Sequence, residues 1–255
     1  MRKYSVSFIG SGNVATHLSK GLKANGHQVR QVVGKSFINS LHLANELQCE
    51  AVRKVEELSD DADVYLIAVK DDEIKHVAEK MRFRGVVAHT SGTTNIDILN
   101  ASSSNTGVFY PLQTFNKNKP LDLKQVPFLI EASNEKSEVI LLQLATELSQ
   151  FVSRANSENR KKVHLAAVYV NNFTNHIFKI AADLMEKEGL SFELLQPLIN
   201  ETIRKIANDH PANTQTGPAK RNDQDVIQEH LRMLEPYPNY SEVYQSITKS
   251  IQKGE

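Results

Sequence analysis

The chain has 255 residues, of which 40% are hydrophobic and 24% charged, as is usual for a folded protein with an apolar core. Its 30 basic and 30 acidic residues balance, so the overall charge does not support nucleic-acid binding. No apolar run approaches the ~20 residues that span a bilayer, and a single cysteine, Cys49, excludes an internal disulfide. The histidines lack metal-ligand spacing, so we expect no metal. Together with the balanced charge, the short apolar runs and the single cysteine, this predicts a cytoplasmic protein with no nucleic-acid partner and no membrane partner.

Short apolar runs alternate with helical runs in the first part of the chain. Strands are expected at residues 4–9, 28–33, 63–69, 85–88, 107–109 and 128–130. Helices are expected at about 12–24, 37–47 and 72–81, the last capped by Asp71. Because the strands are apolar throughout rather than on one face, they predict a parallel sheet covered on both sides.

The pattern changes near residue 157, after which no strand is expected. Helical runs cover about 158–188, 192–209 and 224–234, and a last one starts at Ser241. The predicted architecture is therefore an α/β domain over residues 1–155, followed by an all-helical domain over 156–255.

The sequence GSGNVA, residues 10–15, follows the first predicted strand and opens the first predicted helix. Gly10 allows a tight turn, Gly12 lets the backbone approach a pyrophosphate, and Ala15 allows close helix–strand packing. In this context the motif predicts a Rossmann-type dinucleotide site rather than a glycine-rich turn without a ligand. The residues expected against the cofactor are Gly10, Ser11, Gly12, Asn13 and Val14.

The end of the second predicted strand favours NADP over NAD. NAD sites usually carry Asp or Glu there, whereas this chain has Lys35 and Ser36 and no acidic residue before Glu46. A lysine and a hydroxyl can bind the 2′-phosphate that a carboxylate would repel. We therefore expect NADP(H), with a solvated surface role as the alternative for Lys35.

Two further loops follow strands at the sheet edge where ligands of such folds bind. Val69 and Lys70 end one strand, and His89 and Ser91 follow the next. We expect Val69, Lys70 and Ser91 to line the cofactor site and His89 to contact substrate. The alternatives are a core histidine and an ordinary turn.

The helix predicted over 158–188 is mostly apolar, which indicates burial at the centre of its domain or at a dimer seam. At 100° per residue, the polar residues that gather on one broad face are Lys161, His164, Asn171, Asn172 and Asn175. Such a face could protonate and orient a carbonyl or imine during hydride transfer. Hydrogen bonding between helices of a dimer explains it equally well.

A basic pair, Lys220 and Arg221, precedes a predicted helix for which Asn222 or Asp223 is a natural N-cap. Beside the helix N-terminus the pair could hold an anionic substrate group, or it could form a solvated basic turn. His230, about two turns into that helix, could face the same cleft or the core.

Several segments together resemble one family: GSGNVA, LIAVKDDEI, HTSGTT, YPLQTF, PFLIEA, KKVHLAAVYVNN and QTGPAKRND, followed by His230. Their order resembles that of Rossmann-like NADP oxidoreductases with a C-terminal domain of unknown function, number 2520. The resemblance covers nearly the whole chain. More distantly, the chain resembles pyrroline-5-carboxylate reductase, the deazaflavin-dependent NADP oxidoreductases and the 6-phosphogluconate and β-hydroxyacid dehydrogenases.

The resemblance implies a Rossmann domain and a helical domain of the 6-phosphogluconate-dehydrogenase C-terminal type, often dimeric through the helices. It also implies that Lys161 and His164 match a K-x-x-H pattern in which the lysine acts as acid or base. The chain departs from its relatives at three positions. Leu165 stands where the dehydrogenases have an asparagine. Tyr110 stands where the family usually has a histidine before the proline of the PLQ loop, and Asn222 stands where it usually has a glycine in an R-G-D run.

These features predict an NADP-dependent oxidoreductase that transfers hydride between NADP(H) and a small anionic carbonyl, imine or hydroxy acid. Lys161 or His164 would handle the proton, and Asn171 or Asn172 would orient the substrate. The expected assembly is a homodimer through the helical domain. The alternatives are a non-enzymatic NADP(H)-binding sensor and a deazaflavin-linked NADP reductase.

Overall fold

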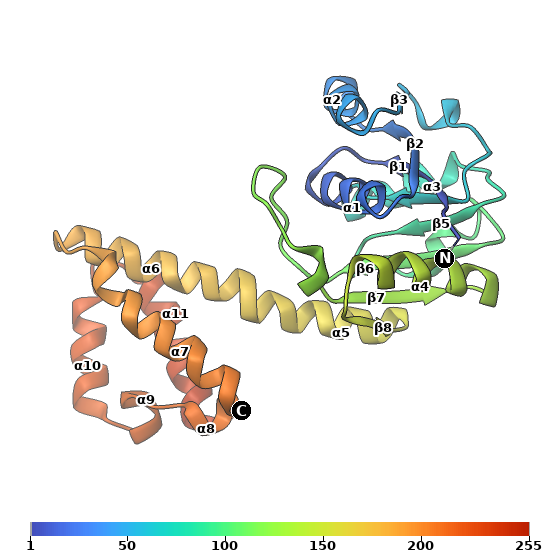
Figure 1. The fold of residues 1–255 in the computed structure, drawn as a ribbon. Helices are drawn as coiled ribbons and strands as arrows, with labels where there is room; N and C mark the ends of the chain where they lie inside the picture. Colours follow the sequence, from blue (N-terminus) through green and yellow to red (C-terminus); the bar gives the residue numbers. More distant parts are fainter. Residues whose placement is uncertain (1, 255) are drawn as a thin grey trace. The chain divides into compact units, whose positions relative to one another are not determined.

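Two compact units, Met1–Val170 and Asn171–Glu255, make up the chain in the computed structural model, which describes residues 2–254. The first contains the sheet with its flanking helices, and the second contains helices (Figure 1). The division by contacts falls later than residue 155, because Ser157 and Arg160 of the following helix are buried within the first unit. The domain boundary at 155/156 stays a prediction.

An eight-stranded sheet forms the centre of the first unit, in the order β3-β2-β1-β4-β5-β6-β7-β8 (Figure 1). Its strands are β1 (Ser5–Ile9), β2 (Gln28–Val33), β3 (Glu50–Ala51), β4 (Val64–Ile67), β5 (Val86–His89), β6 (Thr106–Pro111), β7 (Phe128–Ala132) and β8 (Val152–Arg154). The mostly parallel, Rossmann-like sheet confirms the predicted fold class.

One strand pair corrects the prediction of a parallel sheet. Strands β6 and β7 pair antiparallel, with Phe109 opposite Ile130, whereas the other neighbouring strands pair in parallel. The chain returns from β6 to β7 through residues 112–127, which contain one short 3₁₀ turn and no α-helix. A parallel return needs a crossover, usually a helix, to carry the chain back to the starting edge.

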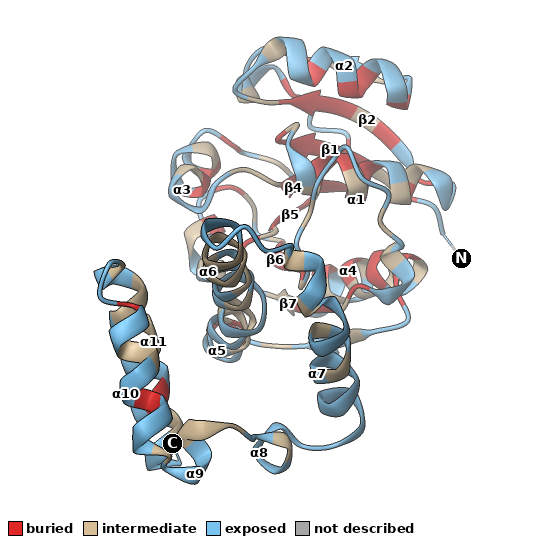
Figure 2. Cartoon of the chain, turned by 90° about the vertical axis from the view of Figure 1, so that its left-hand side faces the viewer, coloured by how far each residue is buried: buried red, intermediate tan, exposed pale blue. Residues whose placement is uncertain are grey.

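Helices cover both faces of this sheet. They are α1 (Asn13–Ala24), α2 (Phe37–Leu47), α3 (Asp71–Glu79), α4 (Glu135–Leu148) and α5 (Ser157–Ala167). Leu18 of α1, Leu43 of α2 and Leu144 of α4 share one apolar cluster with the sheet. Ile74 of α3 belongs to the cluster of the opposite face, together with Leu99 from a 3₁₀ turn. The central strands β1, β4, β5 and β6 are almost entirely buried, whereas the short edge strands β3 and β8 are partly exposed (Figure 2).

Three elements of the first unit were not predicted from the sequence: β3, β8 and helix α4. The first two contain only two and three residues. Helix α4 had a readable signal, because Asn134 caps it by accepting a hydrogen bond from the Ser137 N–H at 2.9 Å. Its buried Leu141, Leu144 and Leu148 also recur at helical spacing.

The long helix predicted over 158–188 consists of α5, a π-helical stretch at Val168–Phe173, and α6 (Thr174–Lys187). A π-helix has hydrogen bonds from residue i to i+5 and so winds more slowly than an α-helix. The rotation of 100° per residue therefore fails between His164 and Asn171, and the predicted common face does not follow from it.

The second unit consists of α6 and five further helices. They are α7 (Gln196–Asn208), α8 (Pro211–Thr214), α9 (Pro218–Arg221), α10 (Gln224–Met233) and α11 (Pro238–Lys253). Among its described residues, those buried are Ile227, Leu234 and Thr248. The long helix is not buried at the centre of a domain of this chain, since Leu165 is 60% and Val170 75% exposed, and its burial at a dimer seam stays a prediction. Figure 2 shows α5 and α6 as exposed or partly buried.

Residues 2–254 contain neither a bilayer-spanning helix nor a cluster of metal-ligating side chains. No helix in that range has the length and apolar character needed to cross a bilayer. No group of three or more His, Cys, Asp or Glu residues in the range is arranged to hold a metal ion.

Candidate functional site

A cleft of about 640 Å³ lies along the ends of β1, β2 and β4 in the first unit. It brings together all predicted cofactor residues except Ser91, namely Gly10, Ser11, Gly12, Asn13, Val14, Lys35, Ser36, Val69 and Lys70. Its other lining residues, which the sequence did not single out, are Asn39, Ala68, Glu73, Thr90 and Lys117. The cleft is where ligands of open α/β sheets bind, at the carboxyl ends of the strands.

The glycines of the GSGNVA turn differ in their surroundings. Gly10 has a φ of +128°, and a Cβ there would lie 2.2 Å from the carbonyl oxygen of Ala68. A Cβ on Gly12 would meet nothing within 4 Å, which leaves open space above the turn. Gly12 is also the N-cap of α1 and supplies no side-chain cap, so the first N–H groups of the helix lack that partner. This donor set and this open space fit the pyrophosphate of a dinucleotide.

An acidic residue stands opposite the expected 2′-phosphate site. The Lys35 ammonium lies 3.1 Å from a carboxylate oxygen of Glu73, on the first turn of α3. Ser36 is the N-cap of α2 and accepts a hydrogen bond from the Asn39 N–H at 3.4 Å. Glu73 was not expected beside Lys35, because it lies on α3, far along the sequence, and reaches Lys35 only through the fold.

His89 and Ser91 lie in the interior at the end of β5. The Ser91 hydroxyl accepts hydrogen bonds from the N–H groups of Thr93 and Thr94, at 3.1 and 3.0 Å, and does not line the cleft. The His89 side chain is fully buried, and burial, with the nearby Arg160 charge, lowers its pKa to about 4. The ring is therefore neutral at pH 7. These positions favour the alternatives, a core histidine and a structural turn.

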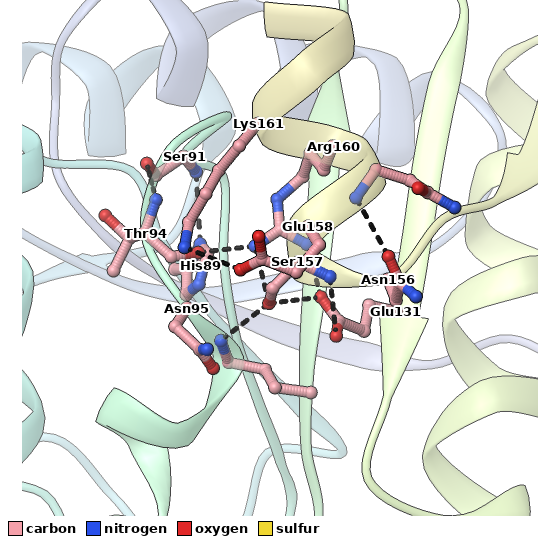
Figure 3. Close-up of polar contacts among 12 residues, drawn as sticks. His89, Ser91, Thr94, Asn95, Glu131, Asn156, Ser157, Glu158, Arg160 and Lys161 are labelled. Carbon is pink, nitrogen blue, oxygen red and sulfur yellow. Dashed lines mark hydrogen bonds and ion pairs between the residues drawn. The ribbon is translucent and has the colours of Figure 1, made fainter.

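A buried arginine joins the start of α5 to the sheet (Figure 3). Arg160 is fully buried, and its guanidinium donates to the Glu131 carboxylate of β7, to the Thr94 carbonyl oxygen, and to the Ser157 hydroxyl at 3.2 Å. The Ser157 N–H in turn donates to Glu131 at 2.9 Å. Arg160 was not predicted, because nothing in the sequence distinguishes it from the exposed bases beside it.

The predicted catalytic histidine pairs with a tyrosine. The Tyr110 hydroxyl, at the end of β6, lies 3.1 Å from His164 Nδ1 on α5. Gly92 packs against both side chains, because a Cβ there would lie 2.6 Å from His164 Nδ1 and 2.8 Å from Tyr110 Cζ. Thr90, two residues earlier, lines the cleft. Burial raises the pKa of Tyr110, so its hydroxyl keeps its proton, and the tautomer of His164 decides which of the two groups donates.

The other predicted catalytic residues are exposed or paired. The Lys161 ammonium lies 3.0 Å from a Glu158 carboxylate oxygen, and both side chains are substantially exposed (Figure 3). Asn171 and Asn172 belong to the second unit, in the π-helical stretch, and are exposed. The structure therefore brings His164 and Tyr110 into contact, and leaves the predicted roles of the two amides as predictions.

The predicted substrate residues of the second unit lie on separate elements. Lys220 and Arg221 end the short helix α9, and Arg221 lies 3.8 Å from Asp223, the N-cap of α10. His230 Nδ1 lies 2.9 Å from the Tyr244 hydroxyl and so links α10 to α11. The hydrogen bond favours a structural role for His230, and the substrate role of the basic pair stays a prediction.

Comparison with protein families matches two adjoining parts of the chain. Residues 5–101 match the family described as coenzyme F420-dependent NADP oxidoreductase, and residues 126–251 match a domain of unknown function, DUF2520. A search of curated proteins finds no match. The family resemblance predicted from the sequence is confirmed.

Solved structures resemble the chain over almost its full length. A candidate NADP oxidoreductase, BF3122 from Bacteroides fragilis, is 37% identical, with 98% of each chain covered and a TM-score of 0.90. Protein TM1727 from Thermotoga maritima is 23% identical, with 98% and 97% covered and a TM-score of 0.73. An imine reductase from Myxococcus stipitatus in complex with NADP⁺ shares the fold at 13% identity, with 98% and 93% covered and a TM-score of 0.69. The chain therefore belongs to the NADP oxidoreductase family in which a dinucleotide-type domain precedes DUF2520.

Proposed function

We propose that this protein is an NADP(H)-dependent oxidoreductase acting on a small anionic carbonyl, imine or hydroxy acid. The observation that carries the proposal is the cleft at the strand ends, where an uncapped helix N-terminus faces open space beside Gly12. Membership of an NADP oxidoreductase family supports it, as does the NADP⁺ complex of the imine reductase with the same fold. When bound, the nicotinamide supplies or accepts the hydride.

Within this proposal, His164 transfers the proton of the reacting substrate group, and Tyr110 orients the His164 ring. In the proposed arrangement Nδ1–H donates to the Tyr110 hydroxyl oxygen, so Nε2 is the nitrogen that takes a proton from a hydroxy substrate and, in the reductive direction, returns it to the carbonyl or imine. Lys161 is the weaker candidate, because its ammonium is held by Glu158, whose pKa it lowers. Asn171 and Asn172 keep the substrate-orienting role expected from the sequence.

Cofactor binding can be tested by titrating the protein with NADPH and then NADH, following nicotinamide fluorescence. We expect tighter NADPH binding, because Lys35 and Ser36 border the cleft. Gly12→Ala should weaken NADPH binding more than about tenfold without lowering the melting temperature, because its Cβ would enter open space where the pyrophosphate approaches. Failure of the wild type to bind either nucleotide would overturn the proposal.

Turnover can be tested with NADPH and a panel of cyclic imines, keto acids and hydroxy acids. His164→Ala should retain NADPH affinity and lose turnover. Lys161→Ala should reduce turnover by a smaller factor. Normal turnover in both variants would contradict the proton-transfer assignment. Tight NADPH binding with no turnover by the wild type over the panel would favour the sensor hypothesis.

A deazaflavin-linked reaction is the second candidate, favoured by the family that matches residues 5–101, whose description names coenzyme F420. In that reaction, reduced F420 would donate hydride to NADP⁺. Loss of the absorbance of reduced F420 together with formation of NADPH would support it. An unchanged spectrum after mixing would exclude it.

We also propose that the protein forms a homodimer through its helical unit. Leu198 and Ile203 of α7 are 65% and 51% exposed, and a second copy would remove such side chains from water. Light scattering should give twice the 28.6 kDa chain mass, and Leu198→Asp should reduce it to a monomer. Val139→Asp, on α4 of the other unit, is the control. A monomeric wild type would contradict the dimer, and the cytoplasmic location stays a prediction.

A further inference from the structure

The loop between β6 and β7 is attached to the first turns of α1. The Lys117 N–H donates to the side-chain oxygen of Asn13, in the GSGNVA motif, at 3.1 Å. The carbonyl oxygen of Asn116 lies 3.0 Å from His17 Nε2, and the Phe115 ring packs on His17 with centroids 5.6 Å apart. These contacts come from three successive loop residues, so they fix the Lys117 backbone beside the turn expected to bind pyrophosphate.

Lys117 lines three adjoining cavities. It lines the cofactor cleft, a polar cavity of about 310 Å³ between α1 and α2, and a groove of about 530 Å³ between α1 and the loop. The polar cavity shares Ser11 and Asn39 with the cleft. Lys117 is the residue common to the linings of all three.

The Lys117 ammonium differs from that of Lys35 in its partners. Lys35 is paired with Glu73, whereas among residues 2–254 no hydrogen bond or ion pair is found for the Lys117 ammonium. A lysine is a flexible point charge that binds phosphate oxygens. Lys117 therefore brings an uncompensated positive charge, on an anchored backbone, to the edge of the cleft.

We propose that Lys117 binds a phosphate group of the dinucleotide. The cofactor is then held between the N-terminus of α1 and the loop that packs on it, and the loop supplies affinity that the GSGNVA turn alone does not. This inference rests on the proposed NADP(H) function. The phosphate is either the pyrophosphate, beside Asn13, or the 2′-phosphate, beside Asn39, and the two nucleotides distinguish them.

The test compares Lys117→Ala with Lys119→Ala in fluorescence titrations with NADPH and NADH. Lys119 is a matched control because it lies two residues further along the loop, is exposed, and lines the groove but not the cofactor cleft. Lys117→Ala should weaken NADPH binding by about tenfold at low salt, and Lys119→Ala by less than about twofold. Lys117→Arg should restore most of the affinity.

The NADH titration identifies the phosphate. An equal loss for NADPH and NADH assigns Lys117 to the pyrophosphate, and a loss confined to NADPH assigns it to the 2′-phosphate. Unchanged affinity in Lys117→Ala, or equal losses in both alanine variants, overturns the inference while leaving the proposed function intact. Absence of nucleotide binding by the wild type overturns both.

Discussion

The two units of the chain differ in where their apolar side chains lie. In the first unit the central strands are buried between helices on both faces, and three apolar clusters fill the interior. In the second unit Leu198, Ile203 and Met233 are more than half exposed, and few described residues are buried. A unit with a complete core holds its site residues in fixed positions. A unit without one depends on another surface to order the residues it contributes.

The largest expected effect compares a buried ion pair with an exposed one. Arg160→Met should destabilise the protein by about 3–5 kcal/mol, because it leaves the Glu131 carboxylate without its buried partner. Arg204→Met, in the second unit, should have no resolvable effect, because Arg204 and Glu201 are largely exposed. Urea unfolding followed by circular dichroism measures both. Equal losses of unfolding free energy in the two variants would mean that the ion pairs of the two units contribute equally to stability.

A second prediction compares two glycines with positive φ. Gly10→Ala should cost about 3 kcal/mol, because a φ of +128° is strained for alanine and its Cβ would collide with the Ala68 carbonyl. Gly189→Ala, after α6, should cost about 1 kcal/mol, because its φ is +67° and a Cβ meets nothing within 4 Å. Melting temperatures of the two variants provide the measurement. A smaller loss for Gly10→Ala would contradict the close packing of this turn.

Local patterns were sufficient to predict most of the first unit. The apolar strands and the GSGNVA turn place most cofactor residues, because strand ends and the following turns are set by nearby residues. Glu73, Tyr110 and Lys117 were missed as site residues, because each reaches its position from a distant segment through the fold. The pairing of Lys35 with Glu73 and the burial of His89 show how far tertiary contacts alter a residue's role.

Prediction was weaker in the helical half for a different reason. The longer helices were located and the short α8 and α9 were not. The π-helical stretch at Val168–Phe173 also breaks the rotation used to align Lys161 with Asn171. The apolar pattern of the long helix indicated burial without naming the surface that covers it. Of the two residues expected as N-cap, Asn222 and Asp223, the structure has Asp223 capping α10, an outcome that depends on local geometry.

A third prediction concerns pH and compares two carboxylates. Burial alone would raise the pKa of Glu147, but hydrogen bonds from Gln143 and Lys3 and the adjacent His27 lower it to about 2. Since the ordinary value is 4.5, Glu147 stabilises the fold above about pH 4.5, and this contribution is lost as the pH falls towards 2. Glu147→Gln should lower the free energy of unfolding by on the order of 1–2 kcal/mol at pH 7, and this loss should become smaller as the pH falls towards 2.

The control for this pH effect is Asp183→Asn in the second unit. Hydrogen bonds from Lys179 and Tyr240 lower the pKa of Asp183, but the pair with Lys179 is exposed. Its contribution should be smaller and should decrease in high salt, which screens exposed charges. Unfolding curves at a series of pH and salt values separate the two. A salt-sensitive effect of Glu147→Gln would contradict its enclosed position.

The smallest expected effects on stability come from two tyrosine–histidine hydrogen bonds, one in each unit. Tyr110 bonds His164 at 3.1 Å, and Tyr244 bonds His230 at 2.9 Å. Replacing either tyrosine with phenylalanine should cost about 1 kcal/mol. The stability measurement therefore does not distinguish a pair that serves the reaction from one that joins two helices.

The histidine tautomers and the turnover rate distinguish the two pairs. Tyr110→Phe removes the hydroxyl that accepts from Nδ1–H in the proposed arrangement, so ¹⁵N spectra of His164 should show more of the tautomer protonated at Nε2, and kcat should fall while NADPH affinity stays within about twofold. Tyr244→Phe should change the ¹⁵N signals of His230 without lowering kcat. If Tyr110→Phe changed the spectrum but left kcat intact, the bond would be structural in both units. If both variants lowered kcat equally, the reaction would need the helical unit as much as the α/β unit.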